Sequence, residues 1–284
     1  TKIFCIQIFL QKKLVLKKIF TLLMQTYTLQ SNTFLGLFVG QNIITLKFVD
    51  STNSYLKDML SKSKPILEGT VILAVEQSAG RGQLGRVWHS ESGKNLTFSI
   101  LLNPAFLPIE QQFDLNKAVS LAINDVLSKY IGTSAKIKWP NDSYIGTRKI
   151  GGILIENSIH GNLLKHAIIG IGLNVNQASF PSVLKNVTSF SQLLQRDHDL
   201  LHLLKEICGA IEARYLQLKA GKFKEIGAEY LSKLYLLNEW SMYRINGKLQ
   251  SGKICGVNAA GYLKVETENQ IKEYGLKEIE FISN

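Results

Sequence analysis

The chain of 284 residues contains only three cysteines, Cys5, Cys208 and Cys255, and they are far apart in the sequence. An odd number of cysteines without a Cys-x-x-Cys pair provides neither a disulfide framework nor a cysteine zinc site. Sparse, unpaired cysteine is typical of reducing compartments, so we expect a cytoplasmic protein.

Long hydrophobic runs are also lacking. Residues 1–23 alternate short apolar runs with five lysines and contain no acid, so no run approaches the about 18 apolar residues of a membrane span. A signal peptide would need one apolar block and a small-residue cleavage site, and neither is clear. A basic amphipathic helix on a membrane surface is an alternative. Because the first methionine is Met24, we instead interpret residues 1–23 as an extension without a working part, and we expect no membrane partner.

Proline is scarce and charge is moderate. Only 5 prolines and 19% charged residues accompany 45% hydrophobic residues, which excludes collagen and intrinsic disorder. The net charge is +11, of which the lysines of residues 1–23 contribute five. The remaining 28 basic residues against 22 acids suit an enzyme with anionic ligands as well as a nucleic-acid-binding protein. Charge alone leaves both classes open.

Hydrophobic periodicity predicts an α+β body followed by a small all-β domain. We predict helices over 116–130, 199–218 and 223–234, the second capped by Asp197 or Asp199, and a shorter helix after an Asp50-Ser51 cap. Body strands are predicted at 42–49, 70–75, 96–102, 137–139, 149–156 and 164–171, with 96–102 half-buried. Strands at 240–245, 248–258, 263–267 and 271–274, with Asn246-Gly247 and Ala260-Gly261 turns, predict a small barrel. We therefore expect an extension over 1–40, a catalytic domain over 41–236 and a β domain over 237–284.

The segment Gly80-Arg81-Gly82-Gln83-Leu84-Gly85 matches the G-x-G-x-x-G pattern after a predicted strand. A dinucleotide site also needs a helix at the third glycine, and a turn follows instead, so the pyrophosphate would have no helix N-terminus. No Gly-Lys-Ser/Thr follows either, which excludes a P-loop. The bare N–H groups, together with Arg81, Arg86 and Trp88, suit an anionic ligand with a flat ring. A plain surface hairpin is the alternative.

A second group of polar residues surrounds two strand starts. Lys138-Trp139-Pro140-Asn141-Asp142 leads through a short hairpin to Arg148-Lys149-Ile150-Gly151-Gly152. A lysine beside a glycine pair can neutralise charge where a carboxylate meets a phosphate, because the glycines let a ligand approach closely. Asp142 could hold Mg²⁺ on phosphate oxygens. A turn with solvated charges is the alternative.

Five motifs together resemble the biotin–protein ligases, from about residue 42 to the C-terminus. They are Asp50-Ser51-Thr52-Asn53, Glu76-Gln77-Ser78-Ala79-Gly80-Arg81-Gly82, Lys138-Trp139-Pro140-Asn141-Asp142, Arg148-Lys149-Ile150-Gly151-Gly152-Ile153-Leu154 and Gly170-Ile171-Gly172-Leu173-Asn174-Val175-Asn176. The resemblance implies a mixed central sheet with packed helices, of the class II synthetase and biotin-ligase type, and an SH3-like barrel. It also implies that biotin and ATP form biotinyl-5′-AMP, whose biotin passes to one lysine of a biotin carboxyl carrier protein.

The resemblance also implies the roles of individual residues. Lys149 and Arg81 would be catalytic, and Asp142 would bind Mg²⁺. The nucleotide would be bound by Arg86, Trp88, Lys138, Asn141 and Asn174. Biotin would be bound by Ser51, Thr52, Asn53, Gln77, Gly80, Arg81, Gly82, Gln83, Lys149 and Gly152. A monomer and a homodimer are both compatible with the sequence.

The sequence departs from the family pattern at two points, and two other protein classes are alternatives to a biotin–protein ligase. Gln83 stands where bacterial members often carry a second arginine, which implies weaker retention of the adenylate if that arginine helps retain it. Residues 1–40 lack a helix-turn-helix, so we expect no DNA partner. A lipoate–protein ligase of similar fold is the nearest alternative, although an octanoyl transferase would need a nucleophilic cysteine and Cys208 looks like core. A basic nucleic-acid-binding protein is a distant alternative.

Overall fold

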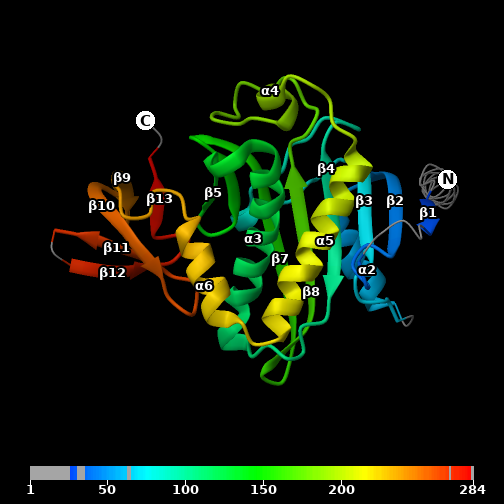
Figure 1. Cartoon of the computed structure of the whole chain (residues 1–284), viewed down its shortest axis with the longest axis horizontal. Helices are drawn as coiled ribbons and strands as arrows, with labels where there is room; N and C mark the ends of the chain where they lie inside the picture. Colours follow the sequence, from blue (N-terminus) through cyan, green and yellow to red (C-terminus); the bar gives the residue numbers. More distant parts are fainter. Residues whose placement is uncertain (1–25, 31–35, 63–64, 269, 283–284) are drawn as a thin grey trace, which may run out of the picture.

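The computed structural model describes residues 26–30, 36–62, 65–268 and 270–282 (Figure 1). Residues 1–23, which we interpret as an extension without a working part, lie outside the described residues. The described chain forms an eight-stranded mixed sheet with packed helices and a separate five-stranded antiparallel sheet, which confirms the predicted α+β class. Among the described residues, no helix has the length and apolarity needed to cross a membrane.

The large sheet is antiparallel except where β2 and β3 run parallel. Its spatial order is β1 (Thr26–Gln30), β2 (Asn42–Val49), β3 (Val71–Gln77), β4 (Leu96–Leu102), β8 (Leu163–Leu173), β7 (Arg148–His160), β6 (Asp142–Ile145) and β5 (Ala135–Lys138). Strands β1 and β6 were not among the strands predicted from the sequence. Because β1 pairs with β2, the sheet already begins within residues 1–40, the segment expected to be an extension.

Helices α3 (Gln112–Ile131), α5 (Leu200–Lys219) and α6 (Phe223–Ser232) pack together against one face of the large sheet (Figure 1). The carboxylate of Asp199 accepts hydrogen bonds from the N–H groups of Leu201 and His202, so Asp199, one of the two predicted residues, caps α5. A short helix, α4 (Phe190–Leu194), was not predicted. Cys208 is buried in the core and burial raises the pKa of its thiol to about 12, as expected of a structural cysteine.

Strand β4 is covered on both faces, and the expectation that it is half-buried was wrong. All seven of its residues are buried. Phe98 and Ile100 join the core under α3 and α5, whereas Leu101 packs with Leu56 of helix α2 (Thr52–Ser61) on the opposite face. The alternating pattern arises because Thr97 and Ser99 on that second face are buried polar residues rather than exposed ones.

The second sheet has the order β12 (Gln270–Tyr274), β11 (Leu263–Thr267), β10 (Lys248–Val257), β9 (Trp240–Ile245) and β13 (Ile279–Phe281), in agreement with the expected SH3-like barrel. Asn246 and Gly247 both have positive φ angles, of 47° and 81°, as a two-residue hairpin requires. The barrel contacts the body through the indole N–H of Trp139, which donates to the carbonyl of Gly261 at 2.9 Å. A side chain at Gly261 would overlap the ring of Phe113, so this close approach needs a glycine.

A buried carboxylate ties the segment before β2 to helix α5. Glu212 accepts hydrogen bonds from three consecutive backbone N–H groups, those of Leu37, Phe38 and Val39, at 2.7, 2.7 and 2.9 Å. The side chain is buried, so these N–H groups replace the water that would otherwise solvate its charge.

Replacing Glu212 with glutamine should therefore lower the free energy of unfolding by about 1–3 kcal/mol, because an amide group has one acceptor oxygen and presents N–H groups to N–H groups. Chemical denaturation measures the change. The control is Asp58→Asn, which breaks an exposed ion pair with Lys62 and should cost less than about 0.5 kcal/mol. Equal losses in the two variants would contradict a special role for Glu212.

Candidate functional site

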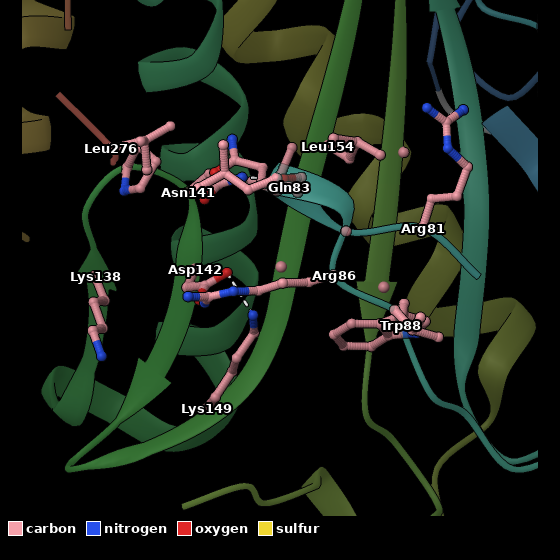
Figure 2. A pocket seen from close by; sticks show the side chains of 18 of the residues that line it. Arg81, Gln83, Arg86, Trp88, Lys138, Asn141, Asp142, Lys149, Leu154 and Leu276 are labelled. Atoms are coloured by element: carbon pink, nitrogen blue, oxygen red, sulfur yellow. Dashed lines mark hydrogen bonds and ion pairs between the residues drawn. The ribbon is translucent and has the colours of Figure 1, made fainter. Parts of the chain in front are cut away.

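A cavity of about 720 Å³ lies between the open face of β7 and β8, the glycine loop and the barrel. Figure 2 shows side chains from these separate segments converging on it. Apart from Gly80, every residue that we predicted for the site lines this cavity: Ser51, Thr52, Asn53, Gln77, Arg81, Gly82, Gln83, Arg86, Trp88, Lys138, Asn141, Asp142, Lys149, Gly152 and Asn174. Gly80 is not a lining residue, and its carbonyl accepts a hydrogen bond from the N–H of Trp88 at 2.9 Å.

Glycines on β7 and β8 provide the floor of the cavity. A Cβ atom at Gly172 would overlap the indole ring of Trp88, and one at Gly170 would overlap the amide of Asn53. Gly152 is paired with Gly172 across the two strands, and a Cβ atom there would press on Asp142 and Lys149. The absence of side chains at these glycines therefore leaves the space in which the side chains of Trp88 and Asn53 pack against the sheet.

The glycine loop is a compact hairpin rather than the start of a helix. The N–H of Gly82 donates to the carbonyl of Arg86 at 2.7 Å, and Arg81 forms a β-bridge with Val87. At its tip, a single 3-10 turn over Gln83–Gly85 contains Leu84 in the left-handed region, with φ of 56°. The next regular element is strand β4, so the structure agrees with the exclusion of a dinucleotide-type loop.

Lys149 and Asp142 form an ion pair inside the cavity. The Lys149 Nζ atom lies 2.7 Å from a carboxylate oxygen of Asp142 and 5.8 Å from the centre of the Trp88 ring. Arg86 reaches across the cavity toward this pair (Figure 2). Among the described residues, no group of three or more His, Cys, Asp or Glu side chains could hold a metal. A divalent cation at Asp142 would thus need ligand oxygens to complete its shell, which suits Mg²⁺ on a polyphosphate.

Lys138 lies beside the Lys149–Asp142 pair but makes contacts of its own. Its Nζ donates to the hydroxyl of Tyr144 at 3.1 Å and lies 4.8 Å from the ring centre of Phe281 in the barrel. Burial lowers the pKa of Lys138, with smaller contributions from neighbouring charges. We predicted Lys138 as a nucleotide ligand, and in the structure its contacts join the body to the barrel.

The opposite end of the cavity carries the residues predicted to meet the biotin ring. Ser99 Oγ lies 2.7 Å from Thr52 Oγ1 and 2.6 Å from Asn53 Oδ1. Because Asn53 Oδ1 can only accept, Ser99 donates to it and the Thr52 hydroxyl donates to Ser99. The lone pairs of Thr52 Oγ1 then remain as acceptors. Gln77 Oε1 accepts from the N–H of Thr52 at 2.8 Å, which leaves Gln77 Nε2 as a donor.

Ser51 is the N-cap residue of helix α2, as predicted for the Asp50-Ser51 pair, but its hydroxyl makes no capping hydrogen bond. The side chain is buried and lines the cavity. Its hydroxyl is therefore not committed to the helix.

Two cavity-lining side chains have buried polar atoms without a hydrogen-bond partner in the described part of the chain, Trp88 Nε1 and Asn174 Oδ1. An unpaired buried donor or acceptor is costly, so both atoms indicate contacts with a bound molecule or water. The amide group of Asn141 instead donates to the carbonyl of Ile153, in the neighbouring strand β7.

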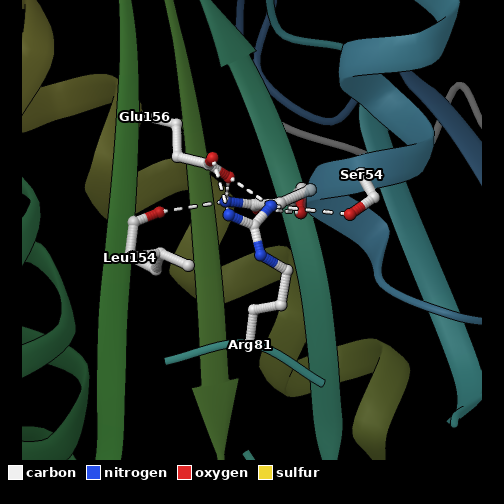
Figure 3. Close-up of polar contacts among 6 residues, drawn as sticks. Ser54, Arg81, Leu154 and Glu156 are labelled. Carbon is white, nitrogen blue, oxygen red and sulfur yellow. Dashed lines mark hydrogen bonds and ion pairs between the residues drawn. The ribbon is translucent and has the colours of Figure 1, made fainter. Parts of the chain in front are cut away.

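Arg81 lies away from the Lys149–Asp142 pair. Its guanidinium group donates to both carboxylate oxygens of Glu156, at 3.0 and 3.1 Å (Figure 3). We predicted Arg81 as a catalytic and ligand-binding residue, and in the structure it lines the cavity and pairs with a carboxylate on β7.

Comparisons with known proteins identify the family of the chain. Residues 45–174 match the model of the Biotin/lipoate A/B protein ligase family. The Bifunctional ligase/repressor BirA of Bacillus subtilis (strain 168) is 33% identical over 248 residues, which cover 85% of this chain and 74% of the relative. A solved structure titled "Biotin protein ligase from Aquifex aeolicus in complex with biotin and ATP" has a TM-score of 0.72 and 31% identity, covering 85% of this chain and 99% of that chain. The chain belongs to the biotin protein ligase family.

In this biotin protein ligase, several residues that line the cavity were not predicted from the sequence. Phe180, Leu184 and Val187 come from the loop after β8, and Arg244 and Leu276 come from the barrel. Apolar residues in a loop carry no motif, and the barrel residues reach the site only because the barrel packs against the body. No local sequence pattern identifies these residues as part of the site.

The floor glycines provide a direct test of the cavity. Gly172→Ala should displace the indole of Trp88, so we expect altered tryptophan fluorescence and at least about tenfold weaker nucleotide binding by calorimetry. Gly209→Ala is the matched control, because a Cβ atom there meets open space in the middle of α5. It should leave binding unchanged and stabilise the protein by about 0.5–1 kcal/mol. Unchanged binding in Gly172→Ala would refute the arrangement of the floor.

Proposed function

We propose that the protein activates biotin with ATP to biotinyl-5′-AMP and transfers the biotin to a lysine of a biotin carboxyl carrier protein. The observation that carries the proposal is a single cavity with two different ends. One end offers neutral donors and acceptors around Thr52 and Gln77, and the other gathers Arg86, Asp142 and Lys149. Family membership and the solved relative titled with biotin and ATP support the same assignment.

The neutral end suits the ureido ring of biotin. A buried urea needs acceptors for its two N–H groups and donors for its carbonyl oxygen. The acceptor lone pairs of Thr52 and the uncommitted hydroxyl of Ser51 meet the first need, and Nε2 of Gln77 meets the second. The charged side chain that lines this end among the described residues, Arg81, is paired with Glu156. A neutral polar head is therefore favoured there over an ionised one.

The charged end suits the adenylation step. A carboxylate oxygen of biotin attacks the α-phosphorus of ATP, the bond to the bridging oxygen breaks, and pyrophosphate leaves. Two anions meet in this step, so the Lys149 ammonium group would neutralise the charge that develops between them. Trp88 Nε1 and Asn174 Oδ1, which have no hydrogen-bond partner among the described residues, would bind the nucleotide. Mg²⁺ held between Asp142 and the phosphates would add further neutralisation.

Transfer to the acceptor completes the reaction. The lysine amine attacks the carbonyl carbon of the mixed anhydride, AMP leaves and the amine loses its proton. The Mycobacterium tuberculosis relative, 28% identical over 190 residues, is named biotin–[acetyl-CoA-carboxylase] ligase. By analogy, the acceptor here would be the biotin carrier of a carboxylase. A lipoate–protein ligase has no comparable need for the urea-type partners around Thr52, which favours biotin.

Lys149→Ala tests the proposal. The purified protein is incubated with MgATP and labelled biotin, or labelled lipoate in parallel, and the trapped adenylate and the labelled carrier are measured. Wild type should form biotinyl-AMP, and Lys149→Ala should form it at least about a hundredfold more slowly.

The control for Lys149→Ala is Lys253→Ala in the barrel. Lys253 forms a 2.7 Å ion pair with Glu266 and lies 5.4 Å from the ring of Trp240, so its surroundings match those of Lys149. It should keep wild-type activity. Label from lipoate alone would establish the alternative ligase, and no adenylate from either acid would refute the enzyme assignment.

A further inference from the structure

Glu156 of strand β7 joins three segments that surround the neutral end of the cavity. One of its carboxylate oxygens, Oε1, accepts from Arg81 at 3.0 Å. The other, Oε2, accepts from Arg81 at 3.1 Å and from the amide group of Asn53 at 2.8 Å. Figure 3 shows the Arg81 guanidinium group lying between this carboxylate and Ser54 of helix α2. Glu156 thus holds the glycine loop and helix α2 to the same strand.

The contacts continue from Glu156 to the residues that would meet the biotin ring. Asn53 is bonded to Glu156 through Nδ2 and to Ser99 through Oδ1, and Ser99 is bonded to Thr52. The side chain of Glu156 is 23% exposed, so its carboxylate is partly shielded from water and its hydrogen bonds to Arg81 and Asn53 replace lost hydration. Arg81, Glu156, Asn53, Ser99 and Thr52 therefore form one continuous chain of hydrogen bonds from the loop to the cavity wall.

We propose that Glu156 is a positioning residue that latches the glycine loop, residues 80–88, over the neutral end of the cavity. The inference rests on the proposed function for its consequence, because the latch would keep bound biotin and its adenylate from leaving. Glu156 is not among the residues that line the cavity. It acts through Arg81, which fixes the loop, and through Asn53, which fixes the orientation of Thr52 and Ser99.

Exposure to protease tests the latch without any ligand. Trypsin cleaves after Arg86, which is exposed in the loop, and mass spectrometry follows that cut separately from others. Glu156→Gln removes the charge that binds Arg81 and turns an N–H group toward it or toward Asn53. We expect cleavage after Arg86 to become about tenfold faster, because a native structure shields a peptide bond only while it stays closed.

Asp125→Asn is the matched control for Glu156→Gln. Asp125 binds Arg214 through two hydrogen bonds of 2.8 and 3.0 Å between helices α3 and α5, far along the chain from the loop. Loss of this pair should lower stability without a selective effect at Arg86. If Asp125→Asn and Glu156→Gln increase cleavage after Arg86 equally, Glu156 is only a stabilising residue and the proposal is wrong.

A second variant tests whether Glu156 acts through Arg81. Arg81→Gln should open the loop as Glu156→Gln does, and the double variant should be cleaved after Arg86 no faster than either single variant. Multiplied effects in the double variant would show independent actions and would overturn the latch. Wild-type cleavage in both single variants would overturn it as well.

Substrate kinetics then measure the consequence of an open loop. Glu156→Gln should raise KM for biotin about tenfold and speed the carrier-independent release of biotinyl-AMP, with a smaller change in kcat. Glu156→Asp, which keeps the charge, should recover part of the loss. Equal kinetics in wild type and Glu156→Gln would refute the role in ligand retention. Absence of adenylate in wild type would refute the proposed function, whereas the ligand-free cleavage assay would still decide whether the latch exists.

Discussion

The packing of side chains onto bare glycine backbone is the constraint on which the rest of the site depends. Gly170 and Gly172 leave the face of β8 open, and Asn53 and Trp88 occupy the space that larger residues would fill. The two side chains come from a helix and a loop that are distant in sequence. Their shared floor holds them in one cavity, together with the Lys149–Asp142 pair that stands beside Gly152.

The division of the cavity follows from where charges are compensated. Arg81 is neutralised by Glu156, so the end near Thr52 presents neutral hydrogen-bonding groups. Arg86, Lys149 and Asp142 stand together at the other end, where phosphates would bring negative charge. A substrate with a neutral polar ring and an ionised carboxylate fits this order of groups. The carboxylate would then meet the nucleotide beside Lys149, where opposing negative charges most need compensation.

Much of the fold could be predicted from periodicity, and much of the site from the combination of motifs. Strands β2, β4, β9 and β11 have the predicted bounds, because alternation and turn residues mark them clearly. Burial of β4 on both faces was missed, since a buried Ser99 is indistinguishable in sequence from an exposed one. The roles of Arg81 and Glu156 depend on which side chains meet across the sheet, and no local pattern carries that information.

We predict that the protein reversibly joins biotin to AMP within this one cavity. Exchange of labelled pyrophosphate into ATP measures that step directly, because label enters ATP only when the adenylate re-forms it. With Mg²⁺ and biotin present, the wild-type protein should catalyse the exchange, and omission of biotin should abolish it. Exchange that proceeds equally without biotin, or no exchange with biotin present, would contradict the formation of biotinyl-AMP in this cavity.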